Sequence, residues 1–207
     1  MMYDFVIWDF DGTLFDTYPI ITRVFLQALE KRGIHESYAA INGAVRVSFG
    51  ELFRYLSAYD LGEEFRLEVE AERRAAEKKL ALPFKGAYGL CADIVSAGGR
   101  NVLFTHRDKT ASEMLRDFGM DTLFCDAVLD GDGFPAKPAP DAVNALISRC
   151  NADRSHAIMV GDREIDIGSG INAGIDSCLC LALDYNNTAA KYKARDFSEI
   201  RKIIFGS

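Results

Sequence analysis

Short apolar segments of β-strand length alternate in this chain with longer segments of helical period. The apolar segments span residues 3–8, 101–104, 126–129, 157–160 and 177–183, and helical patterns lie between them. Strands that alternate with helices in this way form parallel sheets with helices on both faces. We therefore predict an α/β fold with a doubly wound parallel sheet.

One long helical stretch interrupts this alternation after the first apolar segment. Within it, apolar residues such as Ile20 and Val24 recur at helical spacing. The chain has 207 residues, which suits one core domain with a smaller insert. We predict a helical cap domain over residues 17–84, inserted into an α/β core domain formed by residues 1–16 and 85–207.

The composition argues against several classes of protein. Lys and Arg number 24 against 31 Asp and Glu, and the net charge of −7 does not suit a protein that coats nucleic acid or an anionic membrane. No apolar run approaches the roughly 20 residues of a membrane-spanning helix. The N-terminus lacks the basic region of a secretory signal. The 5 cysteines lack CxxC spacing, so we expect reduced thiols and a cytoplasmic protein.

Polar side chains follow four of the apolar segments, at the strand ends where ligands bind in open parallel sheets. In chain order they are Asp9, Asp11, Thr105, Lys137, Asp162 and Asp166. Carboxylates grouped in this way repel one another unless a hard divalent cation such as Mg²⁺ lies among them. A hydroxyl and an ammonium beside them can hold a phosphoryl group, so the set favours phosphoryl transfer.

Taken singly, most of these residues also suit a purely structural role. Asp162 can cap a helix, Lys137 can be an ordinary surface lysine, and Thr105 can simply end a strand. The run of residues 9–13, Asp-Phe-Asp-Gly-Thr after an apolar strand, is much more specific. Its Gly12 permits a tight turn whose backbone N–H groups can face an anion.

The four segments resemble the motifs of the haloacid dehalogenase superfamily of phosphohydrolases, in the order in which that family carries them. The matching residues are 9–17, 103–105, 137–138 and 161–166. The resemblance spans nearly the whole chain, and the helical insert looks like the small cap of the phosphoglycolate phosphatase and β-phosphoglucomutase branch. It implies a Rossmann-like core, Mg²⁺ as the cofactor and a small phosphorylated metabolite as the substrate. We further expect no nucleic-acid or membrane partner, and a monomer or weak dimer.

The same resemblance implies roles for the acidic residues. Asp9 is the nucleophile of a two-step hydrolysis through an aspartyl-phosphate, and Asp11 is its general acid and base. Asp9, the backbone carbonyl of Asp11 and Asp162 hold Mg²⁺. Asp166 acts on the metal through water or through Lys137. An acid at position 11 argues against carbon–halogen cleavage, because the dehalogenases of the superfamily lack it.

Other residues become candidates for binding the phosphoryl group or the rest of the substrate. Thr105 and Lys137 hold the phosphoryl group, with Gly12 and the backbone N–H of His106 as further donors. The His106 ring suits a structural role better than catalysis. Arg46 lies where relatives place a substrate-selecting loop and can clamp a carboxylate or a second phosphate. An exposed loop arginine with no such role explains Arg46 equally well.

Two alternatives to a phosphatase stay open. A phosphomutase of the β-phosphoglucomutase type shares the fold, but mutases that resemble this chain carry a histidine that holds the acid/base idle. The matching position here is Ile21, which cannot hydrogen-bond to Asp11. A receiver-like signalling module also combines acidic residues with a threonine and a lysine, although it lacks both the Asp-x-Asp-Gly-Thr run and a cap.

Overall fold

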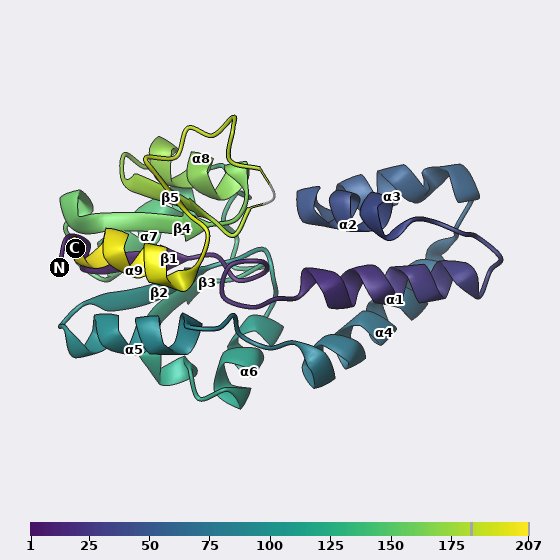
Figure 1. Ribbon diagram of the computed structural model, residues 1–207, viewed down its shortest axis with the longest axis horizontal. Helices are drawn as coiled ribbons and strands as arrows, with labels where there is room; N and C mark the ends of the chain where they lie inside the picture. The colour runs from purple at the N-terminus through teal and green to yellow at the C-terminus, as the bar shows by residue number, and fades with distance from the viewer. Residues whose placement is uncertain (183, 207) are drawn as a thin grey trace. The chain divides into compact units, whose positions relative to one another are not determined.

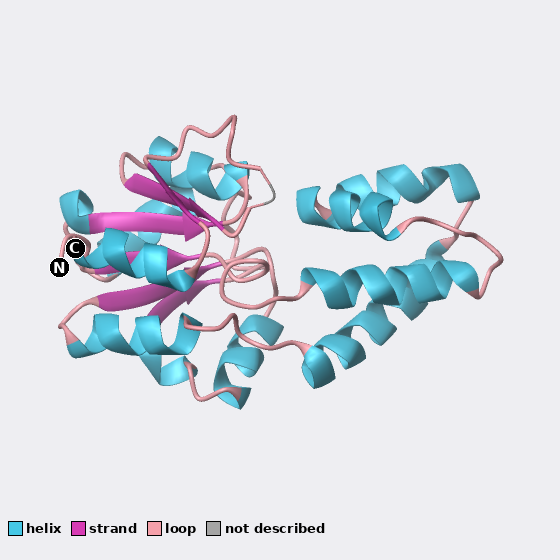
Figure 2. Cartoon of the chain, viewed as in Figure 1, coloured by secondary structure: helices cyan, strands magenta, loops and turns pink. Residues whose placement is uncertain are grey.

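The chain forms two compact units in the computed structural model, which describes residues 1–182 and 184–206 (Figure 1). The larger unit combines Met1–Phe15 with the chain from Pro83 onward, and the smaller unit is Asp16–Leu82. Strands occur in the larger unit, whereas the smaller unit is helical throughout (Figure 2). Among the described residues, no helix combines the length and the apolar character needed to cross a membrane.

The larger unit is built on a parallel sheet, so the predicted α/β fold class is confirmed. Over the described residues the sheet has 6 strands in the order β3-β2-β1-β4-β5-β6, and each neighbouring pair is parallel. The strands are β1 (Phe5–Trp8), β2 (Arg100–Phe104), β3 (Phe124–Val128), β4 (Ala157–Gly161), β5 (Asp176–Cys180) and β6 (Tyr192–Ala194). Strand β6 adds to the five strands that the sequence predicts. The predicted end of the fifth segment, residue 183, lies outside the described residues.

Helices cover both faces of the sheet, as a doubly wound fold requires. They are α5 (Ala87–Ser96), α6 (Thr110–Asp117), α7 (Asp141–Arg149), α8 (Glu164–Asn172) and α9 (Phe197–Phe205), with the short 3₁₀ turns η2 (Asp121–Leu123) and η3 (Arg154–His156). Asp196 caps α9, because its side chain accepts a hydrogen bond from the Glu199 N–H at 2.9 Å.

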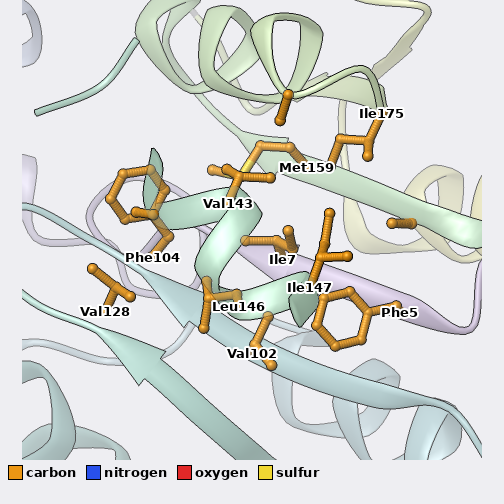
Figure 3. Packing of buried hydrophobic residues seen from close by; sticks show 13 residues of the cluster. Phe5, Ile7, Val102, Phe104, Val128, Val143, Leu146, Ile147, Met159 and Ile175 are labelled. Atoms are coloured by element: carbon orange, nitrogen blue, oxygen red, sulfur yellow. The ribbon is translucent and has the colours of Figure 1, made fainter. Parts of the chain in front are cut away.

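The central strand β1 is buried on both faces, which explains its uninterrupted apolar sequence. Its side chains alternate between the faces. Phe5 and Ile7 belong to a cluster that α7 fills with Val143, Leu146 and Ile147 (Figure 3). On the other face, the Trp8 ring stacks on Phe197 of α9 with centroids 6.1 Å apart. Packing on both faces of β1 therefore fixes the position of Asp9, the residue that follows it.

The smaller unit packs four helices around its own apolar cluster, which includes Phe25, Leu52 and Phe65. The helices are α1 (Tyr18–Glu30), α2 (Tyr38–Val47), α3 (Phe49–Leu56) and α4 (Glu63–Leu80), with the 3₁₀ turn η1 (Ser57–Tyr59).

The expectation of a loop around Arg46 is wrong, because residues 43–47 belong to helix α2. The Ser37 hydroxyl caps α2 by accepting a hydrogen bond from the Ala40 N–H at 3.1 Å. Three buried residues on one face then anchor the helix on its neighbours; they are Ile41 and, one turn later, Ala44 and Val45.

Candidate active site

The strand order brings the predicted polar residues to one edge of the sheet. From β1 the chain passes to β2 and β3 on one side, and it returns to β4 on the other side of β1. At such a reversal the connections leave the carboxyl ends of the two central strands in opposite directions and open a binding crevice. Asp9 directly follows β1, and Asp162 directly follows the adjacent β4.

Three buried carboxylates gather at this edge. Asp9, Asp162 and Asp166 each offer an oxygen, and these oxygens all lie within 4.8 Å of one another. The Lys137 ammonium reaches the same place from the loop before α7. Its Nζ lies 2.6 Å from Asp9 Oδ1 and 2.7 Å from Asp166 Oδ1. Four residues from three separate segments therefore form one buried polar cluster, which we call the acidic cluster: Asp9, Lys137, Asp162 and Asp166.

Burial makes the charges of the acidic cluster unfavourable unless they are compensated. Burial and the neighbouring Asp166 carboxylate raise the pKa of Asp9 to about 6, although Lys137 opposes this shift. Burial alone would lower the pKa of Lys137, but attraction to Asp166 and Asp9 outweighs it and the net shift is upward. Three carboxylates and one ammonium leave a formal charge of −2 on these side chains. Oxygen donors with that charge fit a hard divalent cation such as Mg²⁺.

Glycine at position 161 allows Asp166 to approach the end of β4. A Cβ placed on Gly161 would lie only 2.3 Å from Asp166 Cβ. Asp166 is held at the start of α8, where its Oδ2 accepts a hydrogen bond from the Arg163 N–H at 3.0 Å. The absence of a side chain at position 161 therefore determines how close α8 brings its carboxylate to the acidic cluster.

We expect Gly161→Ala to destabilise the fold by about 1–3 kcal/mol, because overpacking at a backbone contact forces α8 to shift. The free energy of unfolding from denaturant titration measures this effect. Gly89→Ala is the matched control, since a Cβ at Gly89 in α5 meets nothing within 4 Å. Equal stability of the two variants would contradict the close approach of Asp166.

Two threonines follow the neighbouring strands β1 and β2. Thr105 follows β2, and its Oγ1 accepts a hydrogen bond from the Arg107 N–H at 3.1 Å. Its hydroxyl hydrogen can therefore point to a ligand. The Thr13 hydroxyl donates to Asp9 Oδ2 at 3.3 Å. Thr13 lies within the Asp-x-Asp-Gly-Thr run, but its contact with Asp9 was not predicted.

The His106 ring supports the loop that carries Lys137. Its Nε2 accepts a hydrogen bond from the Lys137 backbone N–H at 3.0 Å, and the ring meets Phe104 edge-on with centroids 6.3 Å apart. Partial burial and the Lys137 and Arg163 cations lower the pKa of His106 to about 4, which keeps the ring neutral and able to accept. The histidine ring therefore contacts the acidic cluster through the Lys137 backbone.

Asp11 and Gly12 lie in the turn after Asp9, and both make contacts that the sequence does not predict. The Asp11 carboxylate pairs with Arg107. Gly12 has a φ of +79°, as a tight turn requires. Its N–H donates to the carbonyl of Phe15 at 2.8 Å, so the turn itself uses this donor.

Arg46 lies on α2 of the smaller unit among polar and aromatic neighbours. Its Nε donates to Asn42 Oδ1 at 3.2 Å, and its guanidinium stands 4.5 Å from the centroid of the Tyr18 ring. The Asn42 amide in turn donates to Thr22 Oγ1 at 2.9 Å. These contacts hold the guanidinium on one face of the helix.

Fold and site place the chain among the α/β enzymes whose polar residues gather at the carboxyl edge of a parallel sheet. A family model described as haloacid dehalogenase-like hydrolase matches residues 3–174. The chain belongs to this family, as the sequence motifs predict.

Curated relatives and solved structures agree with this assignment. The chain is 28% identical over 180 residues to pyrophosphatase PpaX of Halalkalibacterium halodurans, which covers 84% of the chain and 81% of the relative. It is 29% identical over 197 residues to phosphoglycolate phosphatase of Vibrio parahaemolyticus, and this match covers 87% of the chain and 83% of the relative. A Deinococcus radiodurans hydrolase of the family, solved with phosphate and sodium, shares the fold with a TM-score of 0.83 at 20% identity, over 99% and 96% of the two chains. The predicted class, a phosphatase of the haloacid dehalogenase type, is confirmed.

Proposed function

We propose that the protein is a Mg²⁺-dependent phosphatase that hydrolyses a small phosphate monoester through an aspartyl-phosphate on Asp9. One observation carries the proposal. The carboxylate directly after the central strand is buried, lies 2.6 Å from an ammonium, and belongs to a cluster of carboxylate oxygens within 4.8 Å of one another. Such a group can attack phosphorus, while the Lys137 ammonium and a cation held by the carboxylates would stabilise the negative phosphoryl oxygens.

The first step forms the intermediate. Asp9 attacks phosphorus in line, the bond from phosphorus to the leaving oxygen breaks, and Asp11 gives its proton to that oxygen. The Lys137 ammonium, the Thr105 hydroxyl and the His106 backbone N–H hold the phosphoryl oxygens. The alcohol then departs.

The second step regenerates the enzyme. Asp11 takes a proton from water, the water oxygen attacks phosphorus, and the bond between phosphorus and Asp9 breaks. Inorganic phosphate leaves, and both aspartates return to their starting forms. Mg²⁺ held by Asp9, the backbone carbonyl of Asp11 and Asp162, with Asp166 acting through water or Lys137, would neutralise charge on the phosphoryl group.

The acidic cluster makes metal removal a direct test of this proposal. We expect EDTA to abolish phosphate release and Mg²⁺ to restore it. Ca²⁺ should inhibit, because its larger radius and higher coordination number let Asp9 bind with both oxygens and lose its line of attack. Asp162→Ala should raise the Mg²⁺ concentration for half-maximal activity sharply, and Asp166→Ala less so. Full activity after exhaustive chelation would contradict the role of the metal.

The substrate that we propose is a small phosphorylated metabolite resembling phosphoglycolate or a sugar phosphate. The names of the two curated relatives support an ester or anhydride of this size. We propose that the helical unit is the cap that selects it, with Arg46 as a candidate contact. The enzyme would act in the cytoplasm as a monomer or weak dimer, an assignment supported by free thiols at all five cysteines.

The alternatives have less support. Ile21, at the position where mutases carry their histidine, is buried in the apolar cluster of the smaller unit. A receiver-like module would keep its phosphate rather than release it. A phosphate-release screen over sugar phosphates, phosphoglycolate and nucleoside monophosphates with Mg²⁺ tests the phosphatase assignment, and formation of a lasting acyl-phosphate without release would contradict it.

A further inference from the structure

Two of the five cysteines lie in contact at the surface of the larger unit. The Cys125 sulfur, on β3, is 3.9 Å from the Cys150 sulfur, at the C-terminal end of α7. Cys125 is exposed and Cys150 is half-buried, whereas Cys91, Cys178 and Cys180 are buried. A disulfide bond holds its sulfurs about 2.05 Å apart, so this pair has to close by about 2 Å to form one. The two thiols are therefore neighbours, and water reaches one of them.

A β-bulge turns Cys125 toward α7. The pairing of β3 with β2 skips one residue between Phe124 and Asp126, so Cys125 is the extra residue of the bulged strand. Adjacent side chains of a regular strand point to opposite faces of the sheet. Here two adjacent residues both contact the end of α7, because Asp126 Oδ2 lies 2.9 Å from Arg149 Nε and Cys125 contacts Cys150. The bulge accounts for this shared direction.

The cysteine pair lies at one end of a strand–loop–helix segment. Cys125 is near the start of β3 and Cys150 directly follows α7, and the two are 25 positions apart in the chain. Lys137 lies in the loop that joins the end of β3 to the start of α7. The cysteine pair and the acidic cluster therefore occupy opposite ends of the same segment. A bond between the sulfurs would close this segment into a covalent ring without contacting the acidic cluster.

Exposure and acidity give the two thiols different roles. Partial burial and the neighbouring Cys125 raise the pKa of Cys150 to about 11, which keeps the Cys150 thiol protonated near neutral pH. Cys125 is the more exposed of the two, so a dissolved oxidant reaches it first. Burial also raises the pKa of Cys178 to about 12, and a buried thiol of this kind is inert.

We propose that Cys125 and Cys150 form a reversible disulfide in response to hydrogen peroxide, and that this disulfide links β3 to α7. The Cys125 thiolate attacks one peroxide oxygen, the O–O bond breaks and hydroxide leaves, so Cys125 becomes a sulfenic acid. The Cys150 sulfur then attacks the Cys125 sulfur and the S–O bond breaks. The departing hydroxyl takes the Cys150 proton and leaves as water. Two thiols are oxidised to one disulfide while the peroxide is reduced to water, and a dithiol reductant reverses the change.

The disulfide should stabilise the folded chain. A bond between residues 25 positions apart restricts the unfolded chain far more than the folded one, in which the two sulfurs already lie in contact. We expect the midpoint of thermal unfolding to rise by about 5–10 °C after treatment with peroxide, and dithiothreitol to reverse the rise. This inference does not depend on the proposed phosphatase function.

Thiol titration after exposure of the folded protein to hydrogen peroxide tests the proposal. The denatured chain offers 5 thiols before treatment, and we expect 5 − 2 = 3 afterwards. The mass of the intact chain should fall by two hydrogen atoms, and a peptide map should join Cys125 to Cys150. The two single variants separate the roles. Cys150→Ser should stop at a sulfenic acid on Cys125 that dimedone labels, whereas Cys125→Ser, the matched control, should keep all of its thiols.

The wild-type protein can overturn the proposal without any variant. All 5 thiols surviving the treatment would show that the pair does not react. A lasting sulfenic acid on Cys125, or a disulfide between two copies of the chain, would show that Cys150 does not complete the reaction. A Cys125–Cys150 disulfide that leaves the unfolding midpoint unchanged would show that the bond does not restrain β3 and α7.

Discussion

Asp9→Asn is expected to lower phosphate release by about 10⁴-fold or more, since it removes the attacking carboxylate while keeping the size of the side chain. The same change should stabilise the metal-free protein. Burial raises the pKa of Asp9 to about 6, so the folded state holds a proton on this group more tightly than the unfolded chain does. The charged form therefore weakens folding as the pH rises through the pKa of Asp9 in the folded state, and asparagine avoids that loss. At pH 8 the gain is up to about 3 kcal/mol, and it disappears in acid.

Two measurements check this prediction: the rate of phosphate release with Mg²⁺, and the free energy of unfolding in EDTA at several pH values. Asp4→Asn is the matched control, because Asp4 directly precedes the same strand at its opposite end. It should leave both quantities near the wild-type values. Retention of more than about a tenth of wild-type activity by Asp9→Asn would contradict the assignment of the nucleophile.

Lys137→Met should abolish activity and, unlike Asp9→Asn, also destabilise the fold. The Lys137 side chain is fully buried and pairs with Asp9 and Asp166 at 2.6 and 2.7 Å. Removing the ammonium leaves two buried carboxylates facing each other, and breaking a buried pair in this way costs about 3–5 kcal/mol. Methionine keeps an unbranched apolar chain of nearly the same length, but it also loses the contact of the ammonium with the Phe104 ring, whose centroid lies 4.7 Å from Nζ.

Denaturant unfolding in EDTA measures the stability of Lys137→Met, with exposed Lys202→Met as the control. Adding Asp166→Asn to Lys137→Met should restore part of the stability, because one of the two uncompensated charges is gone. The double variant should stay inactive. A Lys137→Met protein as stable as the wild type would show that the ammonium does not compensate these carboxylates.

The sequence predicts most of the sheet because its strands are buried on both faces. The run of residues 5–8 has to be apolar throughout, and that pattern is visible without a structure. Strand β6 has no such signal, since Tyr192–Ala194 is three residues long, lies at the edge of the sheet and includes an exposed lysine. The helix that carries Arg46 was missed because its apolar stripe is short and because serine, which caps this helix, is also common in polar loops.

The sequence predicts the part of the site that directly follows the strands. Parallel strands bring their carboxyl ends to one edge, so Asp9 and Asp162 are neighbours once the strands are recognised. Side-chain direction is a different matter. Asp11 and Arg107 are 96 positions apart, and their pairing depends on how two loops turn after their strands. The only sign of this pair in the sequence was the arginine two residues after Thr105, and its position did not predict which carboxylate it contacts.

The two ends of the helical insert lie side by side. The Asp16 N–H donates to the carbonyl of Leu82 at 3.1 Å, and on the core side the Phe84 N–H donates to Leu14 at 2.9 Å. The insert is thus a long connection between β1 and the rest of the sheet, and contacts within the insert already hold its two ends together. Each doubling of the length of a flexible loop would add only about 0.6 kcal/mol to its closure entropy, and a folded insert with joined ends avoids even that. Inserts of other lengths can occupy this place while β1 keeps its register with β2. Evolution can therefore exchange the insert as a module without moving Asp9 and Thr105 apart in space.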